Sequence, residues 1–255
     1  MKKRYAIPLC IIISLVLSII IVSIISGKNK NPITKDVEKA NKFLVKEDSK
    51  DIVSIKKQII QLVEEEKKVE QEKVLSQNPK DIFKNNNVVM IGDSFVEGMA
   101  CYEILYPSNA IYKRGVRIDN IDEQLLKAME LVPDKLVLMY GANDIQIWKS
   151  NVDQFIHNYE EALQKIKEKL PNIKIYICAI FPPNEKGLKI DPAYKFVDIY
   201  NEKLEELCKK ENIVFLNSNK LLLETENSYQ GDGIHIKPSF YNLWVRDLII
   251  KMELK

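Results

Sequence analysis

The chain has 255 residues, 46% of them hydrophobic, and its 38 Lys and Arg residues nearly balance 36 Asp and Glu residues, for a net charge of +2. This length and composition are typical of a globular protein with one large or two modest domains. Basic residues are spread along the chain, so no nucleic acid is expected among its partners. The four cysteines lack the spacing of a metal site or of a disulfide framework.

The N-terminus predicts a membrane anchor at residues 1–27. A basic start, Met1–Arg4, precedes an uncharged stretch, and the apolar run at residues 7–25 would span about 28 Å as a helix, close to the ~30 Å hydrocarbon core. The run is long for a signal peptide and lacks an Ala-x-Ala-like cleavage site, which favours a retained anchor over secretion after cleavage. The basic start predicts a cytoplasmic N-terminus, with the rest of the chain outside the cell.

Residues 28–80 predict a charged helical stalk or linker, because Lys, Glu and Gln dominate from about Thr34 to Gln77 without any glycine. A three-then-four spacing of apolar residues runs from Ile52 to Leu62 and then decays, so a long coiled coil is not expected. A solvated stalk is favoured, with self-association through this helix or an added cap as alternatives. Asn78-Pro79 is expected to end the helix.

Residues 81–255 predict an α/β domain, because short apolar runs alternate with longer amphipathic segments from Asn87 onward. The strands are near-continuously apolar, which indicates burial on both faces. They are expected at 88–91, 111–112, 136–140, 173–181 and 213–216. Helices are expected at 118–131, 152–170, 193–210 and 238–252. We predict one parallel sheet of about five strands, covered by helices on both faces.

Four short loops in this domain carry chemistry. Each is expected at the carboxyl end of a strand or just before the last helix, where α/β sheets place their sites. Six of the eight glycines, at positions 92, 98, 115, 141, 231 and 233, fall in or beside these loops, where backbone must approach closely. The loops are Gly92-Asp93-Ser94, Gly115, Gly141-Ala142-Asn143-Asp144 and Asp232-Gly233-Ile234-His235.

A serine nucleophile and a histidine base are indicated by two of the loops. Ser94 can present its hydroxyl above the sheet, with its own amide near a helix N-terminus. A serine needs a base, and the chain has two histidines. His157 falls off the apolar stripe of its expected helix and is predicted to lie at the surface. His235 follows Asp232 by three positions, so that this acid can orient the imidazole ring.

An oxyanion hole is indicated by the other two loops. Asn143 would place a neutral amide donor beside Ser94, and Gly115 offers a backbone amide to the same oxygen. Each motif alone has a structural alternative, since serines cap helices and Asp-Gly pairs form turns. Their occurrence together and in this order favours a site for serine-based acyl transfer.

These four blocks resemble those of the SGNH hydrolases, also called GDSL lipases/esterases, over roughly Asn87 to Met252. The resemblance implies a flavodoxin-like three-layer α/β/α sandwich without a metal or organic cofactor. Phe95 stands where the family name has Leu, at a position expected to pack inward. The resemblance also implies that Ser94 is the nucleophile, His235 the base and Asp232 the orienting acid, and that Ser94, Gly115 and Asn143 form the oxyanion hole.

The expected function is that of an extracellular, membrane-anchored serine esterase. Families of this kind act on lipids, acyl sugars, thioesters and polysaccharide acetyl groups. The outward location favours acetyl or other short acyl esters on envelope or extracellular carbohydrate. An O-acyltransferase that passes the acyl group to a glycan hydroxyl and a lysophospholipase or lipase are alternatives, and a non-catalytic glycan-binding module is a more distant one.

Overall fold

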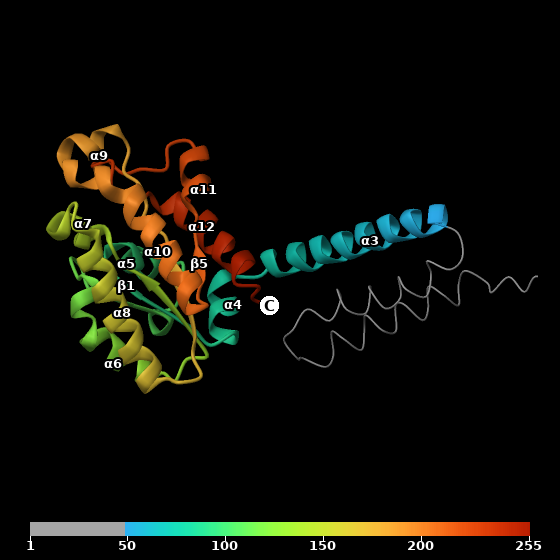
Figure 1. Cartoon of the computed structure of the whole chain (residues 1–255), viewed down its shortest axis with the longest axis horizontal. Helices are drawn as coiled ribbons and strands as arrows, with labels where there is room; N and C mark the ends of the chain where they lie inside the picture. Colours follow the sequence, from blue (N-terminus) through green and yellow to red (C-terminus); the bar gives the residue numbers. More distant parts are fainter. Residues whose placement is uncertain (1–48) are drawn as a thin grey trace, which may run out of the picture. The chain divides into compact units, whose positions relative to one another are not determined.

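The structure, a computed structural model, describes residues 49–255 (Figure 1). The predicted membrane anchor at residues 7–25 and the first part of the predicted stalk lie outside the described residues. Within residues 49–255, no helix has both the length and the apolarity of a membrane span. The chain divides into two compact units, and the second, Val69–Lys255, contains the α/β domain.

Helix α3 (Ser49–Leu75) occupies much of the predicted stalk. Several of its apolar side chains are exposed, including Ile60 at 57% and Leu62 at 58%. The helix ends at Leu75, earlier than expected from the Asn78-Pro79 pair. That pair instead begins helix α4 (Pro79–Asn85), because the Asn78 side chain accepts a hydrogen bond from the Lys80 amide and Pro79 suits the first turn.

A five-stranded, fully parallel sheet forms the centre of the domain, in the order β2-β1-β3-β4-β5. This is the order of a doubly wound α/β sheet. Each predicted strand is present within a few residues of its expected bounds. The strands are β1 (Val88–Gly92), β2 (Ala110–Tyr112), β3 (Lys135–Met139), β4 (Lys174–Cys178) and β5 (Val214–Leu216).

The fourth strand is shorter than the predicted 173–181. Residues 179–181 are buried, but after the Ala179 amide, which still donates to Leu216 of β5, the backbone turns to other partners. The backbone N–H of Ile180 donates to the Asn201 side chain, and the Asn201 amide donates back to the Ile180 carbonyl. The apolar run therefore predicts burial correctly, although a side chain takes the place of a neighbouring strand.

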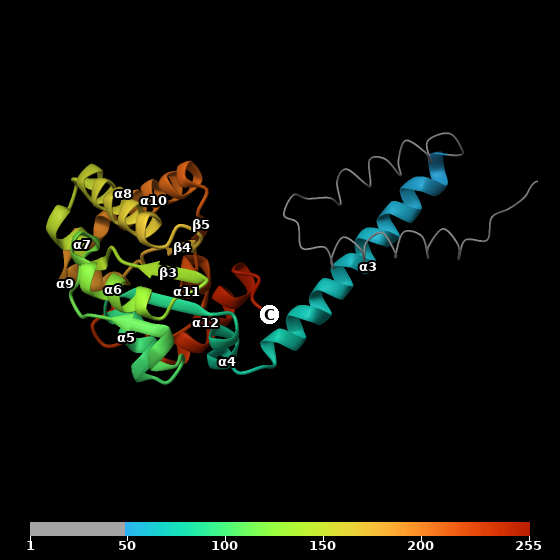
Figure 2. The same ribbon diagram turned by 90° about the horizontal axis from the view of Figure 1, so that it is seen from below.

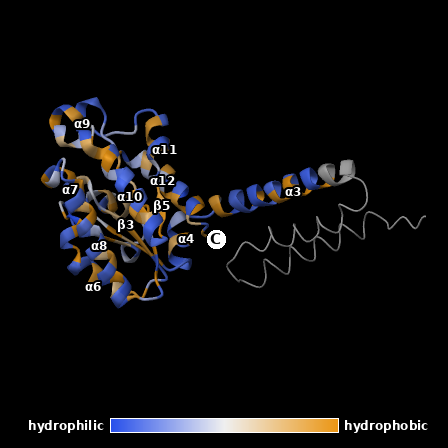
Figure 3. Cartoon of the chain, viewed as in Figure 1, coloured by the Kyte–Doolittle hydropathy of each residue, from blue (hydrophilic) through white to orange (hydrophobic). Residues whose placement is uncertain are grey.

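Helices cover both faces of the sheet. Figure 2 shows the sheet between α8 (Val152–Lys169) and α10 (Val197–Glu211) on one side and α5 (Ser94–Cys101) and α12 (Pro238–Lys251) on the other. The predicted helix 118–131 is a 3-10 turn followed by α6 (Asp122–Glu130), and 193–210 is likewise a 3-10 turn followed by α10. The helices carry hydrophilic and hydrophobic residues together (Figure 3), as expected of elements with one buried face.

Four short helices were not expected from the sequence: α4, α7 (Ala142–Trp148), α9 (Glu185–Ile190) and α11 (Asn219–Glu224). Each has six or seven residues, which is too few to show a helical period. Two of them lie in the loops that follow β3 and β4.

The strand register positions the candidate site. Gly92, the last residue of β1, is level with Tyr112 of β2 and with Met139 of β3. The loops after these three strands therefore emerge side by side. The strand order reverses at β1, and α/β sheets bind their ligands at such a reversal, beyond the carboxyl ends of the strands.

Candidate active site

The first loop ends β1 and starts α5, with Ser94 as the first helical residue. Asp93 caps the helix, because its Oδ1 accepts the Phe95 amide at 3.0 Å. The N–H of Ser94 is then one of the unpaired donors of a helix N-terminus, and within residues 49–255 it donates no hydrogen bond. Negative charge beside Ser94 would meet this amide and the positive end of the helix dipole.

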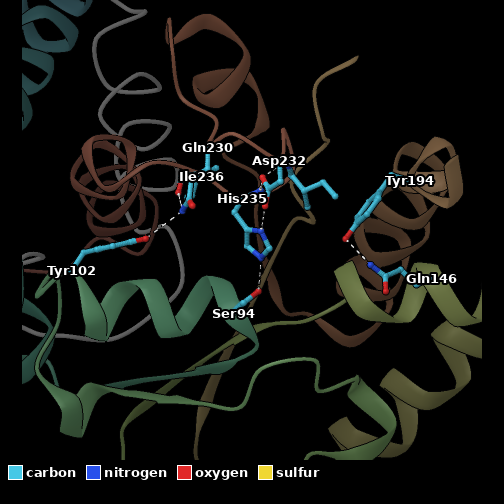
Figure 4. Close-up of polar contacts among 9 residues, drawn as sticks. Ser94, Tyr102, Gln146, Tyr194, Gln230, Asp232, His235 and Ile236 are labelled. Atoms are coloured by element: carbon cyan, nitrogen blue, oxygen red, sulfur yellow. Dashed lines mark hydrogen bonds and ion pairs between the residues drawn. The ribbon is translucent and has the colours of Figure 1, made fainter. Parts of the chain in front are cut away.

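Ser94, His235 and Asp232 form a continuous hydrogen-bonded chain (Figure 4). Ser94 Oγ lies 3.1 Å from His235 Nε2, and His235 Nδ1 lies 2.6 Å from Asp232 Oδ2. With its proton on Nδ1, the imidazole donates to the carboxylate and accepts from the serine hydroxyl. The arrangement can therefore move a proton from Ser94 to His235 while the acid holds the ring.

Hydrogen bonds between the Asp232 side chain and the backbone amides that follow it hold the loop that carries Asp232 and His235. Asp232 Oδ1 accepts the amides of Ile234 at 2.9 Å and His235 at 3.0 Å. Gly233 turns the chain with φ +72°, and a side chain there would place its Cβ 2.1 Å from Asn184 Oδ1. Glycine is thus required both by conformation and by space.

The carboxyl of Asp232 is held in its ionised form. Partial burial acts to raise its pKa, but hydrogen bonds from the His235 ring and from the Ile234 and His235 amides outweigh that effect and lower the pKa below its usual value. The imidazole is supported from its other side by Phe95, whose ring stacks on it with centroids 5.6 Å apart. Phe95 is 2% exposed, so the prediction that it packs inward is confirmed.

Asn143, in the first turn of α7, is engaged on both hydrogens of its side-chain amide. Nδ2 donates to Asp93 Oδ2 at 3.0 Å and to the Val116 carbonyl at 3.2 Å. These bonds join the loops after β1, β2 and β3. The amide N–H of Gly115, in the loop after β2, has no acceptor among the described residues and lines the same pocket as Ser94 and Asn143.

Two buried acids, Asp93 and Asp144, lie beside the side-chain amide of Asn143. Asp93 is 1% exposed, and burial raises its pKa to about 7 against the hydrogen bonds from Phe95 and Asn143. Asp144 is fully buried, and burial likewise raises its pKa to about 7. Its Oδ1 accepts the Ile118 amide at 3.2 Å, while Oδ2 has no hydrogen-bond partner among the described residues. Ionising either acid near neutral pH places an expensive charge in the interior.

A pocket of about 450 Å³ opens beside Ser94. One face of α5 contributes Ser94, Glu97, Gly98 and Cys101, a spacing that places these residues on the same side of a helix. That spacing is the signal in the sequence that could have predicted a pocket wall. The other lining residues are Tyr102, Arg114, Gly115, Asn143, Gln230, His235 and Tyr241.

The remaining candidate groups lie elsewhere. His157 is exposed, which confirms its predicted surface position, and its Nε2 lies 3.4 Å from Glu161 Oε1. Cys101, Cys178 and Cys208 are free thiols, the latter two buried. Within residues 49–255, no cluster of three or more His, Cys, Asp or Glu side chains is arranged to hold a metal ion.

Comparison with known proteins places these features in one family. The model of the GDSL-like Lipase/Acylhydrolase family matches residues 90–243, more than half of the chain, and this range includes all four motif loops. No curated protein matches the chain significantly.

Several solved structures share the fold. A GDSL-like lipase from Bacteroides thetaiotaomicron is 20% identical with a TM-score of 0.51, and the match covers 67% of this chain and 88% of that one. A carbohydrate esterase family 3 protein from Talaromyces cellulolyticus is 17% identical with a TM-score of 0.50, covering 65% and 95%. The chain belongs to the GDSL-like lipase/acylhydrolase family, the SGNH hydrolases, and is a serine esterase that acts on ester bonds.

Proposed function

We propose that the protein removes acetyl or other short acyl groups from carbohydrate through an acyl-enzyme formed on Ser94. One observation carries the proposal: the hydrogen-bonded chain from Ser94 through His235 to Asp232 opens into a small pocket with mostly polar walls. A serine hydroxyl with an oriented base is the arrangement that nucleophilic acyl transfer requires.

In the proposed reaction, His235 Nε2 accepts the Ser94 proton as Oγ attacks the ester carbonyl. Asp232 keeps the second proton of the ring on Nδ1 and stabilises the imidazolium. The oxyanion accepts the N–H groups of Ser94 and Gly115, together with one N–H of Asn143 that leaves the Val116 carbonyl. His235 returns its proton to the departing alcohol oxygen, and water then releases the acid by the same steps.

The preference for a polar alcohol is supported by the pocket. Its walls include Glu97, Arg114 and Gln230, and a hydrocarbon alcohol would strip water from such groups without replacing their hydrogen bonds. The preference for a short acyl group is tested by the chain-length series below.

The first experiment measures hydrolysis of p-nitrophenyl acetate, butyrate and octanoate by the full chain in detergent. Ser94→Ala and His235→Ala should each abolish turnover, and the acetate should be cleaved faster than the octanoate. Ser239→Ala and His157→Ala are matched controls at exposed positions and should retain activity. Equal activity in Ser94→Ala would overturn the proposal. Acylation of an added glycan, in place of hydrolysis, would favour the acyltransferase alternative.

We also propose that residues 7–25 anchor the enzyme in the cell membrane with its catalytic domain outside. The length and apolarity of that run and the basic residues before it support the proposal. The full chain should stay with membranes after an alkaline wash and be degraded by external protease. Release of a shortened chain into the medium would instead indicate a cleaved signal peptide.

A further inference from the structure

The wall of the pocket contains a tyrosine hydroxyl that the proposed chemistry does not use. Tyr241, on α12, is 2% exposed, yet it lines the pocket beside Ser94. Its hydroxyl packs against Gly98 so closely that a Cβ there would lie 2.1 Å from Oη. No described residue forms a hydrogen bond with this hydroxyl, although the hydroxyls of buried tyrosines usually find a partner.

The hydroxyl of Tyr241 is available to a ligand. Oη is not among the fully enclosed polar atoms that lack a partner, so it retains contact with solvent, which reaches it through the pocket. Burial raises the pKa of Tyr241 well above its usual value, and the hydroxyl therefore stays protonated. It can donate a hydrogen bond as well as accept one.

The distance from Ser94 suits a group close to the ester. Gly98 follows Ser94 by four residues in α5, which is roughly 6 Å along the helix axis at about 1.5 Å per residue. Tyr241 Oη therefore lies about one helical turn from Ser94, on the same face of α5. A hydroxyl on the sugar carbon next to the esterified one can bridge this separation, because a hydrogen bond of about 2.8 Å to Oη adds to its own distance from the ester carbon.

The surrounding wall is polar and balanced in charge. Arg114, from the loop after β2, pairs with Glu97 of α5, so that neither charge is left alone. The Tyr102 ring packs on the Tyr241 ring with centroids 5.2 Å apart. Gln230 Nε2 donates a hydrogen bond to Tyr102 Oη at 3.2 Å (Figure 4). Donors, acceptors and aromatic faces without net charge suit an uncharged polyhydroxylated ring.

The position of His235 identifies which part of the ester this wall meets. His235 returns its proton to the leaving oxygen, so the alcohol lies on the side of the imidazole. Gln230 belongs to the same loop as His235, and its N–H donates to the His235 carbonyl at 2.7 Å. Gln230 therefore lies on the side of the alcohol, and Glu97, Tyr102, Arg114 and Tyr241 line the same pocket.

We propose that this wall is a subsite for the alcohol part of the substrate, selecting an uncharged sugar ring, and that Tyr241 Oη bonds a hydroxyl next to the scissile ester. The proposal rests on the proposed function of Ser94. Fatty alcohols are disfavoured as leaving groups, because they would leave these polar groups unpaired.

The test measures hydrolysis of two esters with the same acyl group by the full-length protein. One is a monoacetylated methyl xyloside, and the other is cyclohexyl acetate, whose ring has no hydroxyls. The ratio of their kcat/KM values should favour the sugar in the wild type and fall roughly 3- to 10-fold in Tyr241→Phe, as expected for the loss of one hydrogen bond. Tyr176→Phe is the matched control and should leave the ratio unchanged. The buried hydroxyl of Tyr176 also lacks a partner in the part of the chain that the structure describes, but it lies on β4 away from the pocket.

The outcomes distinguish a failure of the subsite proposal from a failure of the proposed esterase function. A wild type that hydrolyses neither these esters nor p-nitrophenyl acetate would overturn the proposed function itself. Turnover of p-nitrophenyl acetate without a preference for the sugar ester, or an unchanged ratio in Tyr241→Phe, would overturn the subsite alone.

A second variant tests the balance of charge and does not depend on the folding of Tyr241→Phe. Glu97→Gln leaves Arg114 without its acid partner. The variant should shift preference several-fold from the acetylated xyloside towards an acetylated methyl glucuronoside, whose carboxylate the freed guanidinium can bind. An unshifted preference would overturn the assignment of this ion pair to the subsite.

Discussion

At the scale of single residues, Asn143 connects the chemistry of the site with its scaffold. Its amide bridges Asp93 and the Val116 carbonyl, so the same group that is proposed to meet the oxyanion also joins three loops. The position of Asn143 after its strand could be predicted from sequence, whereas its two acceptors could not, because they depend on how neighbouring loops meet.

Asn143→Ala should lower kcat by about 10²–10³ with a smaller effect on KM, because the lost donor acts on charge that develops in the transition state. Steady-state kinetics with p-nitrophenyl acetate measure both parameters. Asn151→Ala makes the same chemical change at an exposed position without a side-chain cap bond and should be silent. A kcat within about threefold of wild type would contradict the oxyanion role.

Asp232→Asn should lower kcat about 10⁴-fold, because an amide no longer selects the tautomer of the His235 ring that carries its proton on Nδ1. The exposed Asp198→Asn serves as a control. Full activity in Asp232→Asn would show that the Ile234 and His235 amide bonds, which an asparagine oxygen could still accept, are the important contribution of this residue.

At the scale of elements, the packing of α5 against α12 shapes the pocket. The two helices meet where Gly98 receives the ring of Tyr241, a contact that amphipathic patterning could not show, since it depends on one missing side chain. The long helices were predictable because their apolar period extends over several turns, and the five strands because their runs, although short, are continuously apolar. The short α4, α7, α9 and α11 were not, because one or two turns carry no measurable period.

Gly98→Ala should destabilise the fold by roughly 1–3 kcal/mol, because the new methyl group overlaps Tyr241 Cζ and Oη and neither helix can retreat without opening the core. Urea unfolding measures the free energy. Gly231→Ala adds the same methyl group where no atom lies within 4 Å and should cost less than about 0.5 kcal/mol. Similar stabilities for the two variants would mean that α12 shifts freely over α5.

At the scale of the whole molecule, the buried acids make stability depend on pH. The pKa of Asp144 is raised from 3.8 to about 7, so between these values the native state holds a proton that the unfolded state has lost. Stability is therefore highest at the acid end of this window and falls as pH rises towards 7. Burial also raises the pKa of Asp93 to about 7, so its titration changes the stability in the same direction.

Asp144→Asn should weaken this dependence, because an amide does not titrate. Urea unfolding at pH 5, 6 and 7 should show a fall in the wild-type free energy of unfolding, of which Asp144 contributes at most about 1.4 kcal/mol per pH unit. The variant should show a smaller fall over the same range. Parallel pH profiles for both proteins would mean that Asp144 is ionised in the native state throughout.

The sequence by itself determined the α/β class, the places of the five strands and the four loops that carry candidate chemistry. These features follow from local patterns, since buried parallel strands are continuously apolar and close turns require glycine. The tertiary structure decided which loops meet. Ser94 and His235 are 141 positions apart, and their 3.1 Å contact depends on strand order and on the Gly233 turn. The free hydroxyl of Tyr241 and the burial of Asp144 were likewise decided by packing, because exposure is a property of neighbours that only folding brings together.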